Sequence, residues 1–193
     1  MTRTEQVWRW ILEHPHGVHQ QQQVAAAVGC AVGTVHLALR VPRAVGAVQV
    51  GGRGFYVTDF AKLLVMWAVH RTVHRDIVDR WTTDRSRREA ESLVVPSARF
   101  TGAAGVKWHY GELPTDYPDV WVYVPEDDVE ELRRRLPESR RQTGTGTAVF
   151  VLRPDALLGP RLSVAQLYAD CWQMPGWWAM EAARYVVRKE GWW

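Results

Sequence analysis

Apolar positions recur with helical spacing at the start of the chain. Within residues 4–14, four apolar side chains fall on one helical face: Val7, Trp8, Ile11 and Leu12. Pro15 and Gly17 follow, and both residue types commonly end helices. The pattern therefore predicts a first helix over residues 4–14.

Residues 21–40 predict two more short helices joined by a tight turn. Ala25 is expected where the two helices cross, because only a small side chain fits there, and Val35 is expected to face the core. Gly29 is expected in the turn, in a conformation that is cheap only for glycine. This spacing is typical of a helix-turn-helix, in which residues 31–39 would be the helix that enters a DNA major groove.

A short hairpin is predicted next. Residues 47–50 form an apolar, β-favouring run, Gly51 and Gly52 are turn residues, and residues 55–57 resume the β pattern. Arg53 lies near the tip. Three helices followed by a hairpin is the order of a winged helix, so we expect residues 1–58 to form a winged helix-turn-helix domain.

Residues 59–92 are expected to form a helical connector. Thr58 is expected to cap a helix that runs to about residue 73. A second helical stretch is expected over residues 76–81. The highly charged residues 82–91 fit either a solvated helix face or a helix close to a linker.

Strands and helices alternate in residues 93–193, which predicts a small α/β C-terminal domain and an α+β fold overall. Residues 93–96 fit either a strand or the end of a helix. The other expected elements are helices over 101–110, 126–136, 163–173 and 177–190, strands over 120–124 and 148–152, and a polar loop over 140–147. Thr101 and Ser163 are the expected helix caps.

Composition is that of a folded, mildly basic protein. Hydrophobic residues make up 47% of the 193 residues, and the formal net charge is +3. This balance suits a phosphate-facing patch without requiring one. The two cysteines, Cys30 and Cys171, lie far apart, and no signal peptide or membrane span is visible. We therefore expect a soluble cytoplasmic protein with two buried thiols.

The eleven tryptophans are many for this length. Some must lie in the core, and others fit a contact surface, because tryptophan is a favoured interface anchor. The end of the chain, residues 191–193, is either exposed or folded back on the C-terminal domain. A surface that contacts a partner would use Trp177, Trp178, Trp192 and Trp193.

The layout resembles the AbiEi-type antitoxins of type IV toxin–antitoxin, or abortive-infection, systems and the winged-helix regulators related to them. The segment TDFAKLLVMWA is similar to the helix that follows the winged helix in that family. FTGAAGVKWHY and VWVYVPEDDVEELRRRL resemble elements of its C-terminal domain, and LSVAQLYADCWQMPGWWAMEAARYVVR resembles its closing pair of helices.

The resemblance implies a transcriptional repressor that binds inverted repeats in its own promoter and controls a toxin gene. It also implies a functional link to a nucleotidyltransferase toxin that is countered without a stable direct complex. Two other functions remain open. One is a protein-interaction module that uses the Trp-rich C-terminal domain, and the other is an architectural or replication-associated protein that binds DNA with little sequence preference.

The expected DNA contacts follow from the predicted helices and hairpin. Val32, Gly33, Thr34 and His36 would face base edges. Arg40 and Arg43, at the end of the helix and just beyond it, suit phosphates, and so does Gln21. Arg53 would enter the adjacent minor groove. A single helix-turn-helix buries little surface, so we expect a homodimer or a cooperative assembly on double-stranded DNA.

Catalytic and metal chemistry find little support in the sequence. A nucleotidyltransferase needs two carboxylates on a strand to hold two metal ions, whereas Asp119 is followed two residues later by Trp121. The histidines of residues 14–19 and the pair His70 and His74 lack further ligands nearby in the sequence. We therefore expect no enzymatic activity, no metal and no cofactor.

Overall fold

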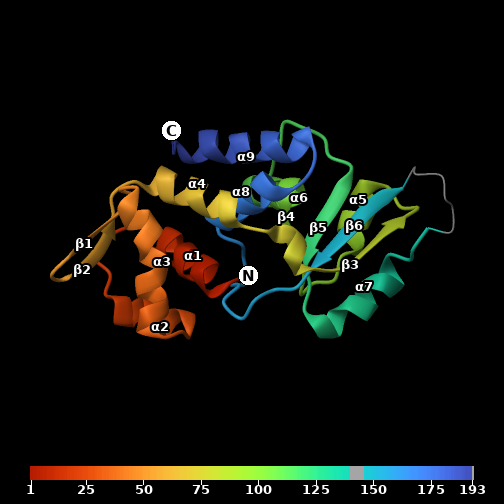
Figure 1. Cartoon of the computed structure of the whole chain (residues 1–193). Helices are drawn as coiled ribbons and strands as arrows, with labels where there is room; N and C mark the ends of the chain where they lie inside the picture. Colours follow the sequence, from red (N-terminus) through yellow and green to blue (C-terminus); the bar gives the residue numbers. More distant parts are fainter. Residues whose placement is uncertain (140–145, 193) are drawn as a thin grey trace.

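A computed structural model describes residues 1–139 and 146–192 as a mixed α+β fold (Figure 1). Most of the expected polar loop, residues 140–145, lies outside the described residues, and so does Trp193. Within the described part, no single helix is both long and apolar enough to cross a bilayer, and the one pair of helices that reaches this length together is bent by 112°.

The chain begins with three helices and a hairpin at one end of the molecule (Figure 1). The helices are α1 (Arg3–Glu13), α2 (Gln21–Val28) and α3 (Val32–Ala44), and the hairpin strands are β1 (Val48–Gly51) and β2 (Gly54–Val57). The three helices were expected, but α3 is longer than expected. Arg40 and Arg43 therefore both lie inside the helix, and the expectation that Arg43 follows it is wrong.

Local chemistry places these helices. Gly29 ends α2 in the left-handed conformation (φ 66°), as expected for the turn. Ala25 and Val35 are buried where α2, α3 and α1 meet. The Trp8 indole Nε1 donates to the carbonyl of Ala38 at 2.8 Å and thereby ties α1 to α3.

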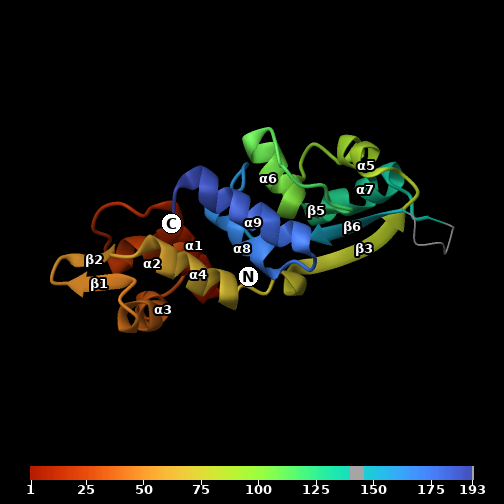
Figure 2. The ribbon, with the colours of Figure 1, turned by 90° about the horizontal axis from the view of Figure 1, so that it is seen from above.

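A second group of helices covers the middle of the molecule (Figures 1 and 2). These helices are α4 (Phe60–His70), α8 (Val164–Gln173) and α9 (Trp177–Glu190). The residue that caps α4 is Asp59, whose side chain accepts from the Lys62 amide, so the expectation of a Thr58 cap is wrong. Thr58 instead donates its hydroxyl to the Gly46 carbonyl at 2.8 Å.

The far end is a four-stranded sheet in the order β3-β6-β5-β4. Its strands are β3 (Ile77–Thr83), β4 (Arg99–Thr101), β5 (Asp119–Tyr123) and β6 (Thr147–Leu152). β5 and β6 are parallel, while β3 and β4 run antiparallel to their neighbours. The strands expected over 120–124 and 148–152 are confirmed as β5 and β6.

The expectation of a helix over residues 76–81 is wrong. A short 3-10 turn, η1 (Val73–Asp76), leads into β3, which pairs with β6 along its length. The Trp81 indole is buried and donates to the Leu136 carbonyl at 2.7 Å. This segment forms a strand because it pairs with another strand about seventy residues later in the chain. Local sequence propensity contains no information about such a distant pairing.

Alternation along the strands divides the sheet into two faces. On one face, Val120, Val122 and Val149 pack in a core with Ala90 of α5 (Arg87–Leu93) and Leu132 of α7 (Val129–Arg135). Residues 93–96 therefore hold the end of a helix, α5. The expected helix over 126–136 begins as a 3-10 turn, η2 (Glu126–Asp128), and continues as α7.

The other face of the sheet joins the main core. Trp121 and Tyr123 pack toward α8 and α6 (Gly102–Tyr110) in a cluster that continues through α4 to α1 and α3. Thr101 takes the cap position of α6, but its hydroxyl donates to Asp170 and leaves the helix end without a side-chain cap. Trp192 folds back against Phe60, with ring centroids 5.1 Å apart.

Candidate nucleic-acid interface

Helix α3 presents one face to solvent and one to the core. Val35, Ala38 and Leu39 are buried, whereas Val32, Gly33 and His36 are exposed, as the helical period predicts. Thr34 is half-buried, so its expected place among the exposed residues is wrong. At about 3.6 residues per turn, Thr34 and His36 lie on opposite flanks of the helix.

The outermost row of α3 combines small, apolar and cationic side chains. By the same period, this row consists of Gly33, Leu37, Arg40 and Ala44, all of them exposed. Leu37 is 61% exposed, and Val41 beside it is 50% exposed. These two apolar side chains were not predicted as surface residues, although their offset from the buried Val35 and Ala38 is visible in the sequence.

A hollow of about 500 Å³ lies between α3, the start of α2 and β1. It brings together four of the eight residues expected to contact DNA: Gln21, His36, Arg40 and Arg43. Leu39, Ala44 and Val50 complete its wall. The guanidinium groups and amide can donate hydrogen bonds, and the imidazole can donate or accept, so the hollow offers donors to an anion.

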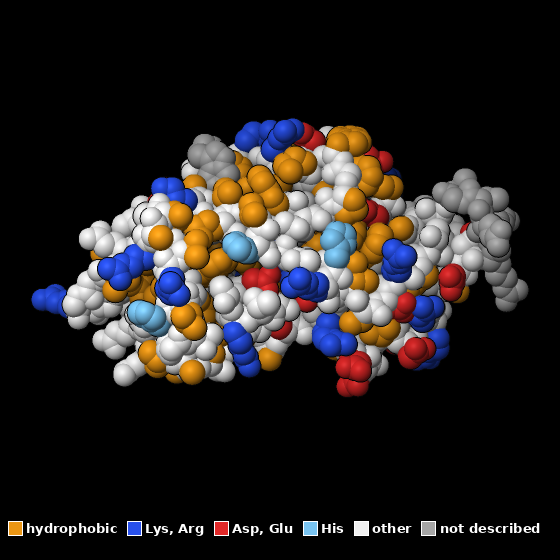
Figure 3. Space-filling model, viewed as in Figure 1, with side chains coloured by type: hydrophobic (Ala, Val, Ile, Leu, Met, Phe, Trp, Pro, Cys, Tyr) orange, Lys and Arg blue, Asp and Glu red, His pale blue; other side chains and the backbone are white. Residues whose placement is uncertain are grey.

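The charge of this end of the molecule is one-sided. No acidic residue occurs between Glu13 and Asp59. Within residues 1–139 and 146–192, Arg40, Arg43 and Arg53 have no ion-pair partner, although many other arginines do. Figure 3 shows basic side chains and no acidic ones on the visible face of the hairpin end. The result is a cationic surface that an anionic partner can approach without repulsion.

The hairpin is braced against the helices. His19, just before α2, exchanges two backbone hydrogen bonds with Phe55 of β2, at 2.7 and 2.9 Å. A Cβ on Gly54 would lie 2.3 Å from the His19 carbonyl oxygen, so only glycine permits this approach. Arg53 is exposed in the turn between the strands and does not line the hollow. The hairpin therefore holds Arg53 apart from the other arginines.

Two helix ends contribute further donors. The cap residues of α2 and α3, Gln20 and Ala31, make no side-chain cap hydrogen bond. Amide groups of a first helical turn that lack side-chain acceptors point outward along the helix axis and attract negative charge. The α2 end adjoins the hollow, because Gln21 is both its first residue and a lining residue.

The histidines considered as metal ligands are dispersed. His14 stacks on Trp10, with ring centroids 4.3 Å apart, and His70 packs edge-on against Trp8. His74 contacts the Gln173 carbonyl at 3.2 Å. In the part of the chain that the structure describes, no group of three or more His, Cys, Asp or Glu side chains could hold a metal ion.

A buried polar cluster joins the sheet to the central helices. Asp170 of α8 is fully buried and accepts from Arg71 Nε at 3.1 Å, from the Tyr123 hydroxyl at 2.7 Å and from the Thr101 hydroxyl at 2.8 Å. Burial, followed by the nearby Asp170 charge, raises the pKa of Tyr123 well above its ordinary value. The role of the Arg71 charge in this cluster was not predicted from the sequence. Since these charges are enclosed, the cluster holds elements together rather than presenting chemistry to solvent.

The described residues thus define an α+β protein with a cationic surface on α3, the α2 end and the hairpin. No family model matches the chain, no curated protein matches it, and no solved structure matches it.

Proposed function

We propose that the protein binds double-stranded DNA, with residues 1–58 as a winged helix-turn-helix and α3 as the recognition helix. The observation that carries this proposal is an exposed face of α3 in a segment, residues 14–58, that has no acidic residue and whose three arginines have no ion-pair partner among the described residues. A solvated structural face would ordinarily mix both signs of charge, whereas phosphate-binding surfaces carry one.

The recognition helix would enter the major groove by its outermost row. Gly33 and Ala44 let the helix backbone come close to the base edges. Arg40 can make two hydrogen bonds to a guanine, and Leu37 and Val32 can contact thymine methyl groups. Because α3 has one arginine in this row, direct readout covers few base pairs, and DNA shape supplies part of the specificity.

Phosphate contacts would flank the groove. Gln21 and Arg43 line the hollow, which adjoins the start of α2, and together with the first amides of α2 they would hold one backbone phosphate. Arg53 on the hairpin would reach the adjacent minor groove, as a wing does. These contacts set the register of the helix on the duplex.

The biological role proposed is transcriptional repression, with autoregulation of a toxin–antitoxin-type operon. This step depends on the resemblance of the sequence to AbiEi-type antitoxins. A nucleotidyltransferase gene beside this one would support it. Repression of a reporter from the chain's own upstream region, lost in an Arg40→Ala variant, would test it in cells.

The binding experiment is a mobility shift with the upstream region of the gene, in the presence of bulk competitor DNA. We expect Arg40→Ala to reduce affinity about tenfold or more and to relax sequence preference, because each good base contact contributes about 1–3 kcal/mol. Arg53→Ala should weaken binding to all sequences alike and lower the slope of log affinity against log salt by about one.

Arg88→Ala is the matched control, since Arg88 is an exposed arginine on α5, outside the proposed surface. Its affinity and salt slope should equal those of the unmodified protein. If the upstream region does not compete better than bulk DNA, the protein binds without sequence preference. If neither DNA is shifted, the proposal fails.

A second candidate function is supported by Trp177, which is 66% exposed at the start of α9. An exposed indole is a common anchor at protein interfaces. The test is capture of a partner protein by the unmodified chain. Loss of this partner in a Trp177→Ala variant that still binds DNA would support an interaction module instead.

A further inference from the structure

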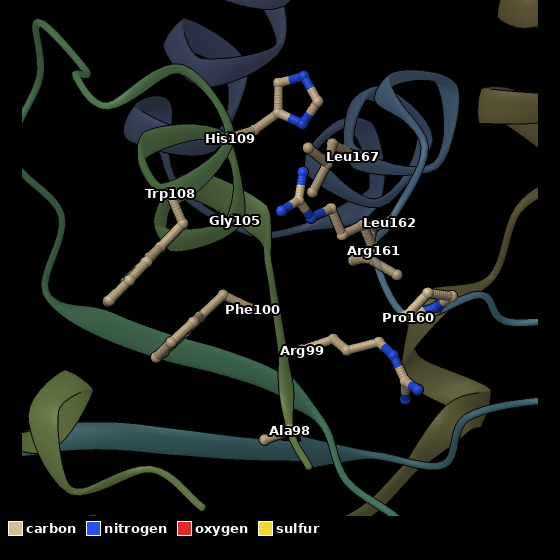
Figure 4. Close-up of a pocket in the computed structure, with 10 residues that line it drawn as sticks. All are labelled: Ala98, Arg99, Phe100, Gly105, Trp108, His109, Pro160, Arg161, Leu162 and Leu167. Atoms are coloured by element: carbon tan, nitrogen blue, oxygen red, sulfur yellow. The ribbon is translucent and has the colours of Figure 1, made fainter. Parts of the chain in front are cut away.

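A pocket of about 580 Å³ opens on the side of the molecule that carries β4 and α6 (Figure 4). Its walls come from β4, α6, the start of α8 and the segment that precedes α8. It shares no residue with the hollow beside α3. The lining residues are Ala98, Arg99, Phe100, Gly105, Trp108, His109, Pro160, Arg161, Leu162 and Leu167.

One wall of the pocket is an aromatic stack. The rings of Phe100 and Trp108 are parallel within 4°, with centroids 5.2 Å apart, and Figure 4 shows both projecting to the same side. Trp108 is nevertheless 60% exposed. Phe100 thus holds the indole in a fixed orientation while much of its surface stays open to a planar ligand.

Basic side chains line another part of the pocket. Arg99, Arg161 and His109 line it, and none of the lining residues is acidic. The Arg99 Nε is buried and has no hydrogen-bond partner among the residues described. Arg161 is exposed, has no ion-pair partner within residues 1–139 and 146–192, and reaches toward α6 in Figure 4. The pocket therefore offers hydrogen-bond donors to an anion next to an aromatic surface.

Close backbone packing forms the pocket floor. A Cβ on Gly105 would lie 2.6 Å from the Phe100 carbonyl oxygen and 2.7 Å from Leu167 Cδ2. Only glycine at this position lets α6 rest directly on β4 and α8. The backbone packing thus fixes the floor of the pocket, as is usual for small-molecule sites.

We propose that this pocket binds a nucleoside phosphate. The base would lie against Trp108, and the phosphate would accept hydrogen bonds from the Arg161 guanidinium, which points toward α6, the helix that carries Trp108 (Figure 4). The pocket volume lies within the range of about 300–1,000 Å³ that is typical of small-ligand sites. A planar ring joined to an anion matches both walls at once, whereas a bare anion leaves the aromatic wall unused. This site is separate from the proposed DNA surface, so it can be tested independently of that proposal.

The test is calorimetric titration of the full chain with ADP, adenosine and inorganic pyrophosphate. We expect ADP to bind more tightly than either half-ligand. Trp108→Ala should lower ADP affinity about tenfold, because stacking on an aromatic side chain contributes about 1–3 kcal/mol per base. Arg161→Ala should bring ADP affinity close to that of adenosine.

Two control variants test whether the loss of ADP affinity is specific to the pocket. Trp177→Ala removes an indole of similar exposure that lies outside the pocket, and Arg88→Ala removes an arginine on α5. Both should bind ADP as the unmodified protein does. Since Trp108 is largely exposed, its replacement leaves the fold intact, which the thermal unfolding midpoint checks.

Three results would overturn the proposal. The first is the absence of any heat of binding when ADP is titrated to millimolar concentration. The second is an equal affinity of Trp108→Ala and Trp177→Ala for ADP, and the third is an affinity for pyrophosphate as high as that for ADP. A single-stranded oligonucleotide that displaces ADP and binds more tightly would assign the aromatic wall to nucleic acid instead.

Discussion

At the scale of single residues, buried charges in this protein are matched by several partners each. Glu91 of α5 is buried and accepts from Arg87 Nη1 at 2.7 Å, from the Tyr117 hydroxyl at 2.7 Å and from Lys107 Nζ at 3.1 Å. Burial opposes its charge, but the hydrogen bonds outweigh burial and hold the pKa of Glu91 below its ordinary value. The carboxylate joins α5 to α6 and to the chain before β5.

Glu91→Gln should reduce the free energy of unfolding by about 2 kcal/mol at neutral pH, because three donors lose a charged acceptor. A carboxyl whose pKa is lowered by folding stabilises fully above its ordinary pKa of 4.5, and this contribution is lost as the pH falls through the lower, folded pKa. The difference between the two proteins should therefore shrink on acidification. Urea unfolding from neutral pH down to acid pH measures it.

Glu130→Gln is the control for this measurement, since Glu130 is an exposed carboxylate on α7. Its stability should follow that of the unmodified protein. If the difference in unfolding free energy between Glu91→Gln and the unmodified protein stays constant at every pH, the stabilising role of the Glu91 charge is contradicted.

At the scale of elements, helices α2 and α3 depend on the glycine turn that joins them and on the packing of α3. The turn between them needs the left-handed conformation at Gly29. Ala31 is the cap residue before α3. Its dihedral angles are extended, but its methyl side chain cannot accept a hydrogen bond from a first-turn amide. The helix is thus stabilised by its packing through Val35, Ala38 and Leu39 rather than by its start.

Ala31→Ser should raise the free energy of unfolding by about 1 kcal/mol, because a serine hydroxyl can accept from a first-turn amide. Gly29→Ala should lower it by about 1 kcal/mol, because the left-handed conformation is strained for alanine. Gly33→Ala is the matched control: Gly33 is helical, and a Cβ there meets no atom within 4 Å. Thermal unfolding of the three variants measures these shifts, and a Gly29→Ala protein as stable as Gly33→Ala would contradict the account.

At the scale of the whole molecule, one core runs from the hairpin end to the sheet. Segment 59–92, which was expected to be a connector, supplies α4 to that core and β3 to the edge of the sheet. Arg9 of α1 also makes two hydrogen bonds to Asp155, at 2.8 and 2.9 Å, which ties the first helix to the segment before α8. The proposed DNA surface is therefore held rigidly on the rest of the chain.

A rigid, single recognition unit buries too little DNA for tight binding, so we expect two copies on each inverted repeat. Sedimentation of the complex should give two chains per repeat and one per half-site. The full repeat should bind more tightly than a half-site. A single chain on both DNAs, with equal affinity, would contradict this expectation.

The sequence by itself determined the parts that depend on local periodicity. The spacing of Val7, Trp8, Ile11 and Leu12 sufficed for α1, and the apolar runs before and after residue 140 sufficed for β5 and β6. Gly29 marked its turn because no other residue adopts that conformation cheaply. The exposure of His36 and Gly33 followed from the helical period in the same way.

Only the tertiary structure decided the features that join distant segments. β3 is a strand because β6 pairs with it, and Arg71 is buried because Asp170 of α8 compensates its charge. The hollow beside α3 and the pocket at Trp108 each gather residues from separate elements. Backbone pairing, charge compensation and enclosed volume depend on which segments meet in space, and a single window of sequence does not contain that information.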